Sequence, residues 1–307
     1  MASDWYLKTS SNWKLVNNAF VKVSGSWKEI QEGYIKVSGA WKQFYQAFVA
    51  TAFSTATANT TIVVPDGANA IHVQAAVGGG SGGVVGAEYD KAGGESAGAG
   101  GASGGYVSDQ VYSVTEGETL TLTVGAAGGK STGSAYNTSA GNGGTTSLSG
   151  STTGSIFSLT GGVGGSASGG GVQGPLRSNN PSTAGTATVS ASVLTSGSFK
   201  ESDGSSASIP SATTLDNGPV GSYNSSGNGV AGTNPGNCGG DNCQITGGVG
   251  GASYAGNISG GAGGVASSSN GGNGSRGSGA GGGGAQGQTN GGDGGAGEIV
   301  YRFLRVQ

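Results

Sequence analysis

The sequence predicts an all-β protein, in which N-terminal β-hairpin repeats precede a jelly-roll-like β-sandwich with an inserted bundle of polyglycine II-type helices. Three observations support this fold class. The first 47 residues contain a repeat, strand-like runs bracket the long central region, and that region holds nearly all of the 70 glycines. We therefore expect two parts, a repeat region at residues 1–47 and a glycine-rich region at residues 48–307.

The N-terminal repeat has a period of 14 residues, which is marked by Trp13, Trp27 and Trp41. Each unit contains a β-prone run, then a turn signal such as Ser24-Gly25. A second run begins at the tryptophan, and this order is typical of a β-hairpin. Three such units predict a meander with an aromatic ladder, which is too small to be stable without a partner.

Aromatic residues and lysines recur together on this short segment, so we interpret it as a docking module. The alternative is that the aromatic residues form an ordinary core. The candidate docking residues are Trp5, Trp13, Phe20, Trp27, Tyr34 and Trp41.

The glycines are concentrated in residues 78–297 and have local order. The pentad Gly-Gly-x-Gly-Gly follows a three-residue unit Gly-Gly-x, which is the repeat of an extended helix with three residues per turn. Such a helix has no internal hydrogen bonds, so its amides must bond to neighbouring segments. Composition alone is also typical of disorder, which is the alternative. The pentads lie at Gly79–Gly83, Gly161–Gly165, Gly247–Gly251, Gly260–Gly264 and Gly291–Gly295.

Strand patterns occur on both sides of the glycine blocks. Residues 119–124 alternate between polar and apolar side chains, and the turn signals Pro65-Asp66-Gly67 and Glu116-Gly117-Glu118 separate neighbouring runs. These patterns favour a sandwich whose strands are interrupted by glycine insertions. The strand regions are 48–77, 106–124, 145–160 and 298–306.

Charge and hydropathy exclude several classes of function. The formal net charge is −3, so a nucleic-acid partner has no electrostatic basis. Lysine exceeds acidic residues in residues 1–50, whereas acidic residues exceed basic ones in residues 78–297. No apolar run is long enough for membrane insertion, and the N-terminus lacks a signal peptide, so we expect synthesis in the cytoplasm.

Residues that could carry catalysis are sparse. The one histidine, His72, lies in a strand-like run and has no triad partners at a supporting spacing. The carboxylate pairs Glu116/Glu118 and Glu201/Asp203 lie in turn-like sequence, where we expect them to be solvated. Cys238 and Cys243 are compatible either with a disulfide or with two free thiols, and a metal site would need more ligands. The sequence predicts no enzyme, no cofactor and no metal.

The part from residue 48 to residue 307 resembles the glycine-rich domain found in phage tail proteins. The resemblance is carried by the order Ile62-Val63-Val64-Pro65-Asp66-Gly67, Ile71-His72-Val73, a Gly-Gly-Gly entry, Val114–Gly125, glycine pentads and a final Ile299-Val300-Tyr301. The lysine–tryptophan repeat resembles short β-repeats at the N-terminus of tail-fibre and baseplate proteins. Fibre-tip adhesins of some phages are similar in plan, although their attachment domain differs from this N-terminal part.

This resemblance implies a non-enzymatic tail-fibre or tail-tip adhesin that binds a bacterial surface protein or polysaccharide. Residues 1–47 would then attach the chain to other tail or baseplate proteins of the virion, as a homotrimer or as a monomer on a trimeric fibre. The least glycine-rich stretch, residues 175–244, is where long loops would collect binding residues. Candidate receptor contacts at loop tips, each of which could instead be a packing residue, are Tyr89, Tyr136, Phe199, Tyr223 and Tyr254.

Two other functions are compatible with the sequence. The first is a structural tail component or spacer without a receptor site. The second is an ice-binding protein, but this would require a strict glycine register, and the register here slips between the pentads.

Overall fold

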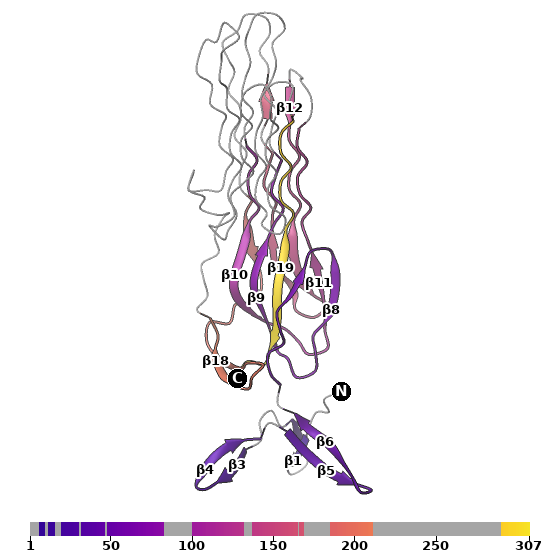
Figure 1. The fold of residues 1–307 in the computed structure, drawn as a ribbon, viewed down its shortest axis with the longest axis vertical. Helices are drawn as coiled ribbons and strands as arrows, with labels where there is room; N and C mark the ends of the chain where they lie inside the picture. Colours follow the sequence, from indigo (N-terminus) through magenta and orange to yellow (C-terminus); the bar gives the residue numbers. More distant parts are fainter. Residues whose placement is uncertain are drawn as a thin grey trace, which may run out of the picture.

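The computed structural model describes residues 6–9, 12–15, 20–30, 32–46, 48–82, 100–131, 137–164, 166–168, 185–210 and 290–307. Within these ranges the chain forms β-strands and no helix, which confirms the all-β prediction. All strand pairs in this part are antiparallel. Figure 1 shows the hairpins at one end, a sandwich in the middle, and extended segments that leave the opposite end of the sandwich.

Each N-terminal repeat forms a hairpin. The turns at Ser24-Gly25 and Ser38-Gly39 have positive φ at both residues (50° and 85°, 52° and 85°), as a two-residue type I′ turn requires. The strands are β1 (Tyr6–Thr9), β2 (Asn12–Leu15), β3 (Phe20–Val23), β4 (Ser26–Glu29), β5 (Glu32–Val37) and β6 (Ala40–Gln46).

The hairpins do not join into the predicted meander. Among the described residues, β1–β2, β3–β4 and β5–β6 are three separate two-stranded sheets. The connection between β4 and β5 contains Ile30, and a β-branched residue disfavours the positive φ that a tight turn back would need.

Two larger sheets follow. In the described part the first has the order β10-β9-β19-β7, and the second has the order β16-β14-β13-β11-β8. The strands of the first sheet are β7 (Ser54–Ala56), β9 (Ala70–Val77), β10 (Tyr106–Ser113) and β19 (Glu298–Leu304). The strands of the second sheet are β8 (Thr60–Val63), β11 (Thr119–Thr123), β13 (Thr146–Gly150), β14 (Gly154–Leu159) and β16 (Ala187–Val189).

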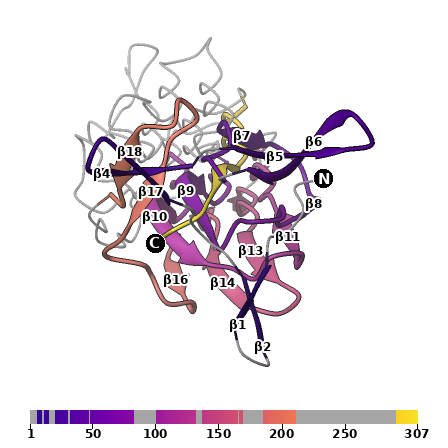
Figure 2. The same cartoon turned by 90° about the horizontal axis from the view of Figure 1, so that it is seen from below.

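The two sheets share one apolar core, so they form a sandwich. In β11 the alternation is visible directly, because Leu120 and Leu122 are buried while Thr119 and Thr121 are exposed. Figure 2 views the molecule from below and shows the sheet of β9 and β10 beside the sheet of β13 and β14. Fully buried members of this core include Ile71, Val73, Tyr112, Leu148, Ile156, Phe157, Leu159 and Ile299.

Extended segments continue the sandwich strands beyond the sheets, and we call them the glycine bundle. Each segment lies within two residues of a strand; for example, residues 78–82 follow β9 and residues 290–297 precede β19. In the described part, the members of the bundle are residues 78–82, 100–105, 125–131, 140–144, 160–164, 185–186 and 290–297.

The backbone amides of the glycine bundle donate hydrogen bonds to three neighbouring segments in turn. In residues 78–82, successive N–H groups donate in turn to segment 100–105, segment 140–144 and segment 290–297, and the cycle then repeats. The bonds run from Gly78 to Gly105 (2.8 Å), Gly79 to Gly144 (2.9 Å), Gly80 to Gly295 (2.8 Å), Ser81 to Ala102 (2.8 Å) and Gly82 to Gly141 (3.1 Å).

Burial follows the same period of three. In segment 125–131, Gly125, Gly128 and Ser131 are buried, whereas the four residues between them are exposed. In segment 290–297, Asn290 and Asp293 are partly exposed, and the glycines between them are buried. Where a segment lies at the surface, as in residues 290–297, the Gly-Gly-x pattern therefore places glycine at the contacts and the third residue towards solvent. In segment 78–82, by contrast, the third residue, Ser81, is fully buried.

Glycine serves two different purposes in this chain. At the hairpin turns, Gly25 and Gly39 have open space around an added Cβ, so glycine is needed there for its positive φ. In the bundle, Gly79 and Gly143 have no left-handed φ, but a Cβ would overlap the carbonyl oxygens of Ala126 and Gly79 respectively. Close backbone approach is therefore what requires glycine in the bundle.

Candidate functional site

The hairpins expose large aromatic side chains. Trp27 and Trp41 are each 69% exposed, Phe20 is 54% exposed and Tyr34 is 48% exposed. In the sandwich, by contrast, Tyr112 is fully buried. Hence no part of the described chain forms a core around these four predicted docking residues.

Each tryptophan faces a lysine on the neighbouring strand. Lys22 pairs with Trp27 and Lys36 pairs with Trp41, and the Nζ atoms lie 5.8 Å and 6.0 Å from the ring centroids. These distances are at the outer limit of a cation–π contact. In the β1–β2 hairpin the register pairs Lys8 with Trp13. The three hairpins thus repeat one cross-strand unit.

The second face of the hairpins is aliphatic. Side chains alternate between the faces of a strand, so Val21 and Val23 lie on the face opposite Phe20 and Lys22. They are exposed, as are Ile35 and Val37 in the next hairpin. Both faces of each of these hairpins therefore present apolar side chains to solvent.

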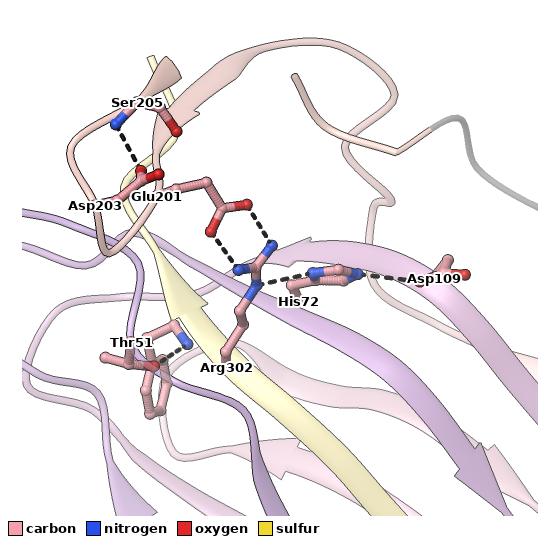
Figure 3. Close-up of polar contacts among 8 residues, drawn as sticks. Thr51, His72, Asp109, Glu201, Asp203, Ser205 and Arg302 are labelled. Atoms are coloured by element: carbon pink, nitrogen blue, oxygen red, sulfur yellow. Dashed lines mark hydrogen bonds and ion pairs between the residues drawn. The ribbon is translucent and has the colours of Figure 1, made fainter. Parts of the chain in front are cut away.

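A polar cluster lies on the outer face of the first sheet (Figure 3). The Arg302 guanidinium on β19 donates two hydrogen bonds to the Glu201 carboxylate, at 2.6 and 3.0 Å. Its Nε donates to Nδ1 of His72 at 3.3 Å, and Nε2 of His72 lies 3.4 Å from Oδ1 of Asp109. The guanidinium carbon is 4.5 Å from the ring centroid of Phe53.

This cluster fastens a small hairpin to the sandwich. Glu201 follows β17 (Ser198–Lys200), which pairs with β18 (Ser206–Ser208). Beside the ion pair, Phe199 packs with the outer-face residues Val111 and Leu304 in a second apolar cluster. Its ring centroid is 5.2 Å from the guanidinium carbon of Arg302. The ion pair and the apolar contacts together hold residues 198–208 against the sheet.

A family model for the glycine-rich domain matches residues 54–304. The chain belongs to the glycine-rich domain family. The match covers both sheets of the sandwich and the described glycine bundle, and the hairpins precede it. None of the curated proteins matches the chain.

One predicted receptor contact, Phe199, does not lie where it was expected. Phe199 is only 3% exposed, so the expectation that it stands at a loop tip is wrong. Its aromatic ring is needed in the apolar cluster under the small hairpin. Tyr89, Tyr136, Tyr223 and Tyr254, together with Trp5, Cys238 and Cys243, are outside the described residues, and Trp13 is described only by its place in β2.

The expectation of solvated carboxylates is wrong for Glu201, which pairs with Arg302, and for Glu118. Glu118 is buried and accepts hydrogen bonds from the Thr153 hydroxyl and from the amides of Thr115, Thr152 and Thr153. Burial by itself raises the pKa of Glu118, but these hydrogen bonds outweigh it and lower the pKa below its ordinary value. Glu118 thereby ties the turn after β10 to the turn after β13.

The described ranges lack two kinds of feature. They contain no group of three or more His, Cys, Asp or Glu side chains that could hold a metal ion. They also contain no helix that is long and apolar enough to cross a membrane.

We expect His72 to make the protein less stable as the pH falls below neutral. Burial, followed by the positive charge of Arg302, lowers the pKa of His72 below 6.5, while Asp109 and Glu201 oppose this shift. Below about pH 6.5, His72 binds a proton in the unfolded chain but not in the folded protein. The free energy of unfolding therefore falls as pH decreases. The fall levels off below the folded-state pKa, where both states are protonated.

Urea unfolding at pH 7.5, 6.5 and 5.5 measures this dependence. Because the chain has one histidine, His72→Gln should remove most of the slope in this window. An unchanged slope in the variant would show that another group causes the loss.

Proposed function

We propose that this chain is a non-enzymatic adhesin of a phage tail fibre or tail tip that binds a bacterial surface protein or polysaccharide during host recognition. The observation that carries the proposal is that the two ends of the molecule differ (Figure 1). Exposed aromatic hairpins lie at one end of the sandwich, and the glycine bundle extends from the other. Such a molecule can be held at one end while it binds with the opposite end.

In this proposal the glycine bundle is a stiff spacer of polyglycine II-type helices on a jelly-roll-like sandwich. The rotation of lateral hydrogen bonds with a period of three supports the helix type, because polyglycine II has three residues per turn and no internal bonds. Segment 78–82 bonds to neighbours on several sides, including Gly162 N–H to Gly79 O (2.9 Å) and Gly128 N–H to Gly80 O (2.8 Å). Lateral bonding on several sides resists bending of any one segment.

Receptor contacts would come from stretches of the chain that lie between the described bundle segments in the sequence. Residues 83–99 and 211–289 are two such stretches, and both are outside the described residues. Tyr89, Tyr136, Tyr223 and Tyr254 remain the candidate contacts because aromatic side chains often dominate binding energy. Several copies on one virion, as a homotrimer or on a trimeric fibre, would raise weak single contacts to useful avidity.

A purely structural spacer in the tail is the second candidate. It is favoured by the described surface of the glycine bundle, whose exposed positions, such as Ala127, Lys130 and Val163, carry no aromatic side chain. A spacer would attach to tails and bind no cell.

Binding to intact bacteria tests the proposal. The labelled full chain is incubated with a panel of strains, and cell-bound label is measured by flow cytometry. We expect selective binding to a subset of strains, with Tyr89→Ala, Tyr136→Ala, Tyr223→Ala or Tyr254→Ala weakening it at one or more positions. Trp27→Ser is the matched control, because it changes an aromatic residue at the other end and should leave cell binding unchanged. If the chain binds none of the strains, the adhesin is wrong and the structural spacer is the remaining candidate.

A further inference from the structure

The three hairpins carry one chemical unit at equivalent positions. Lysine faces tryptophan across the strands in the same register each time: Lys8–Trp13, Lys22–Trp27 and Lys36–Trp41. A second lysine follows each tryptophan, at positions 14, 28 and 42. The acidic residues Glu29 and Glu32 do not recur at the period of 14. The repeat therefore conserves apolar and cationic groups, and no anionic ones, from unit to unit.

The hairpins are separate units joined by short connections. The described strands of one hairpin do not pair with those of another. β2 ends at Leu15 and β3 begins at Phe20, while β4 ends at Glu29 and β5 begins at Glu32. With about 200 Å² for a whole aromatic side chain, Phe20, Trp27, Tyr34 and Trp41 together expose on the order of 500 Å². About half of this area lies on each of the two hairpins, and exposed aromatic side chains gathered in this way favour an interaction site.

Charge selects the kind of partner. The hairpins of a second copy would place lysine against lysine, because Lys22 and Lys36 occupy the exposed faces. A nucleic acid would neutralise the lysines and stack on the tryptophans, but it offers nothing apolar to the aliphatic face of Val21, Val23, Ile35 and Val37. A protein surface that combines carboxylates with apolar side chains complements both faces.

We propose that residues 6–46 are a trivalent dock, in which each hairpin occupies one of several equivalent acidic, apolar-lined sites on a protein built of repeated subunits. This inference rests on the proposed attachment of the chain to a phage tail. Once one hairpin is bound, the next is held near its own site by a short connection, so its binding becomes intramolecular. Modest affinity at each site then adds up to stable attachment.

The test measures how binding to tail particles changes as the hairpins are altered one, two or three at a time. The full chain and the variants Trp13→Ser, Trp27→Ser and Trp41→Ser, singly and combined, are titrated against purified tail particles that lack the chain. We expect each single substitution to weaken binding by about 10-fold or more and the losses to multiply in the combinations. Trp27→Phe should retain most of the binding. If one hairpin accounts for all binding, or any single substitution equals the triple one, the trivalent dock is wrong.

Two treatments, added salt and nuclease digestion, distinguish an acidic protein site from a nucleic acid. Binding should weaken as NaCl is raised from 0.05 to 0.5 M, and Lys22→Gln with Lys36→Gln, which leaves the tryptophans in place, should reduce this dependence. If binding does not change with the NaCl concentration, the claim that the partner site is acidic is wrong. Loss of binding after nuclease treatment of the particles, or equal binding to a single-stranded oligothymidylate, would make the partner a nucleic acid and overturn the protein site.

The failure of the two claims can be told apart. If the wild-type chain does not bind tails at all, the proposed attachment is wrong. If the wild type binds and the hairpin variants bind equally well, attachment stands and the dock is not in the hairpins. Thermal unfolding of each variant should match that of the wild type, because the sandwich has its own core.

Discussion

Alanine at Gly79 should destabilise the protein by about 3–5 kcal/mol, which is a large part of the stability of an ordinary domain. The added Cβ would overlap the carbonyl oxygen of Ala126 and also lie 2.9 Å from the amide nitrogen of Gly144. Both neighbours are backbone, so neither can rotate away as a flexible side chain could. The segments must separate, and lateral hydrogen bonds such as Gly79 N–H to Gly144 O are then lost.

Gly129→Ala is the matched control for this prediction. Gly129 lies in the same bundle, but an added Cβ there meets nothing within 4 Å, and its φ is not left-handed. This variant should match the wild type or be more stable by about 0.4–1 kcal/mol, because alanine restricts the unfolded chain. Chemical unfolding of the two variants measures the difference. Equal stabilities would mean that close packing is not the reason for glycine in the bundle.

Glu201→Gln should release the small hairpin of β17 and β18 from the sandwich. The substitution keeps the size of the side chain but removes the negative charge that faces Arg302, whose side chain is only 13% exposed. An uncompensated guanidinium beside Phe53, Phe199 and His72 costs about 1–3 kcal/mol at this partial exposure. The loss should be local, because the hairpin lies outside the core that the two sheets share.

Hydrogen exchange resolved by segment measures this release. Amides of residues 198–208 should exchange faster in Glu201→Gln, while those of β9 and β11 keep their protection. Asp203→Asn, in the exposed turn of the same hairpin, keeps an oxygen for the Ser205 amide and should change little. Uniformly faster exchange over the whole sandwich would contradict a local role for the ion pair.

The sequence predicts the parts of the fold that local patterns determine. Alternation marks β11 and the apolar strand β19, and Ser-Gly marks the two-residue turns of β3–β4 and β5–β6. The strands β16, β17 and β18 are only three residues long, so their own sequence gives a weak signal. Their pairing is decided by the larger strand or apolar cluster against which they lie.

The same distinction holds for the candidate sites. Regular spacing is enough to locate Trp27 and Trp41, because their chemistry repeats. The ion pair joins Glu201 to Arg302 across 101 positions of sequence, and no local pattern connects them. Arg302 stands between the apolar neighbours Tyr301 and Phe303 in β19, which is a signal that it needs a partner but does not say which one. The serine- and threonine-rich sequence around Phe199 favours a loop tip, and only the fold shows that this residue is buried.

In the proposed function the two ends of the molecule have different partners. A peptide epitope inserted in the turn at Ser38-Gly39, where Gly39 has open space around it, reports on the hairpin end. The measurement is antibody binding to this epitope on chains already attached to cells of a strain that they recognise. The account predicts that the epitope stays as accessible on cells as on the free chain. Loss of antibody binding on cells would show that the hairpins themselves hold the bacterium, and the assignment of the two ends would be wrong.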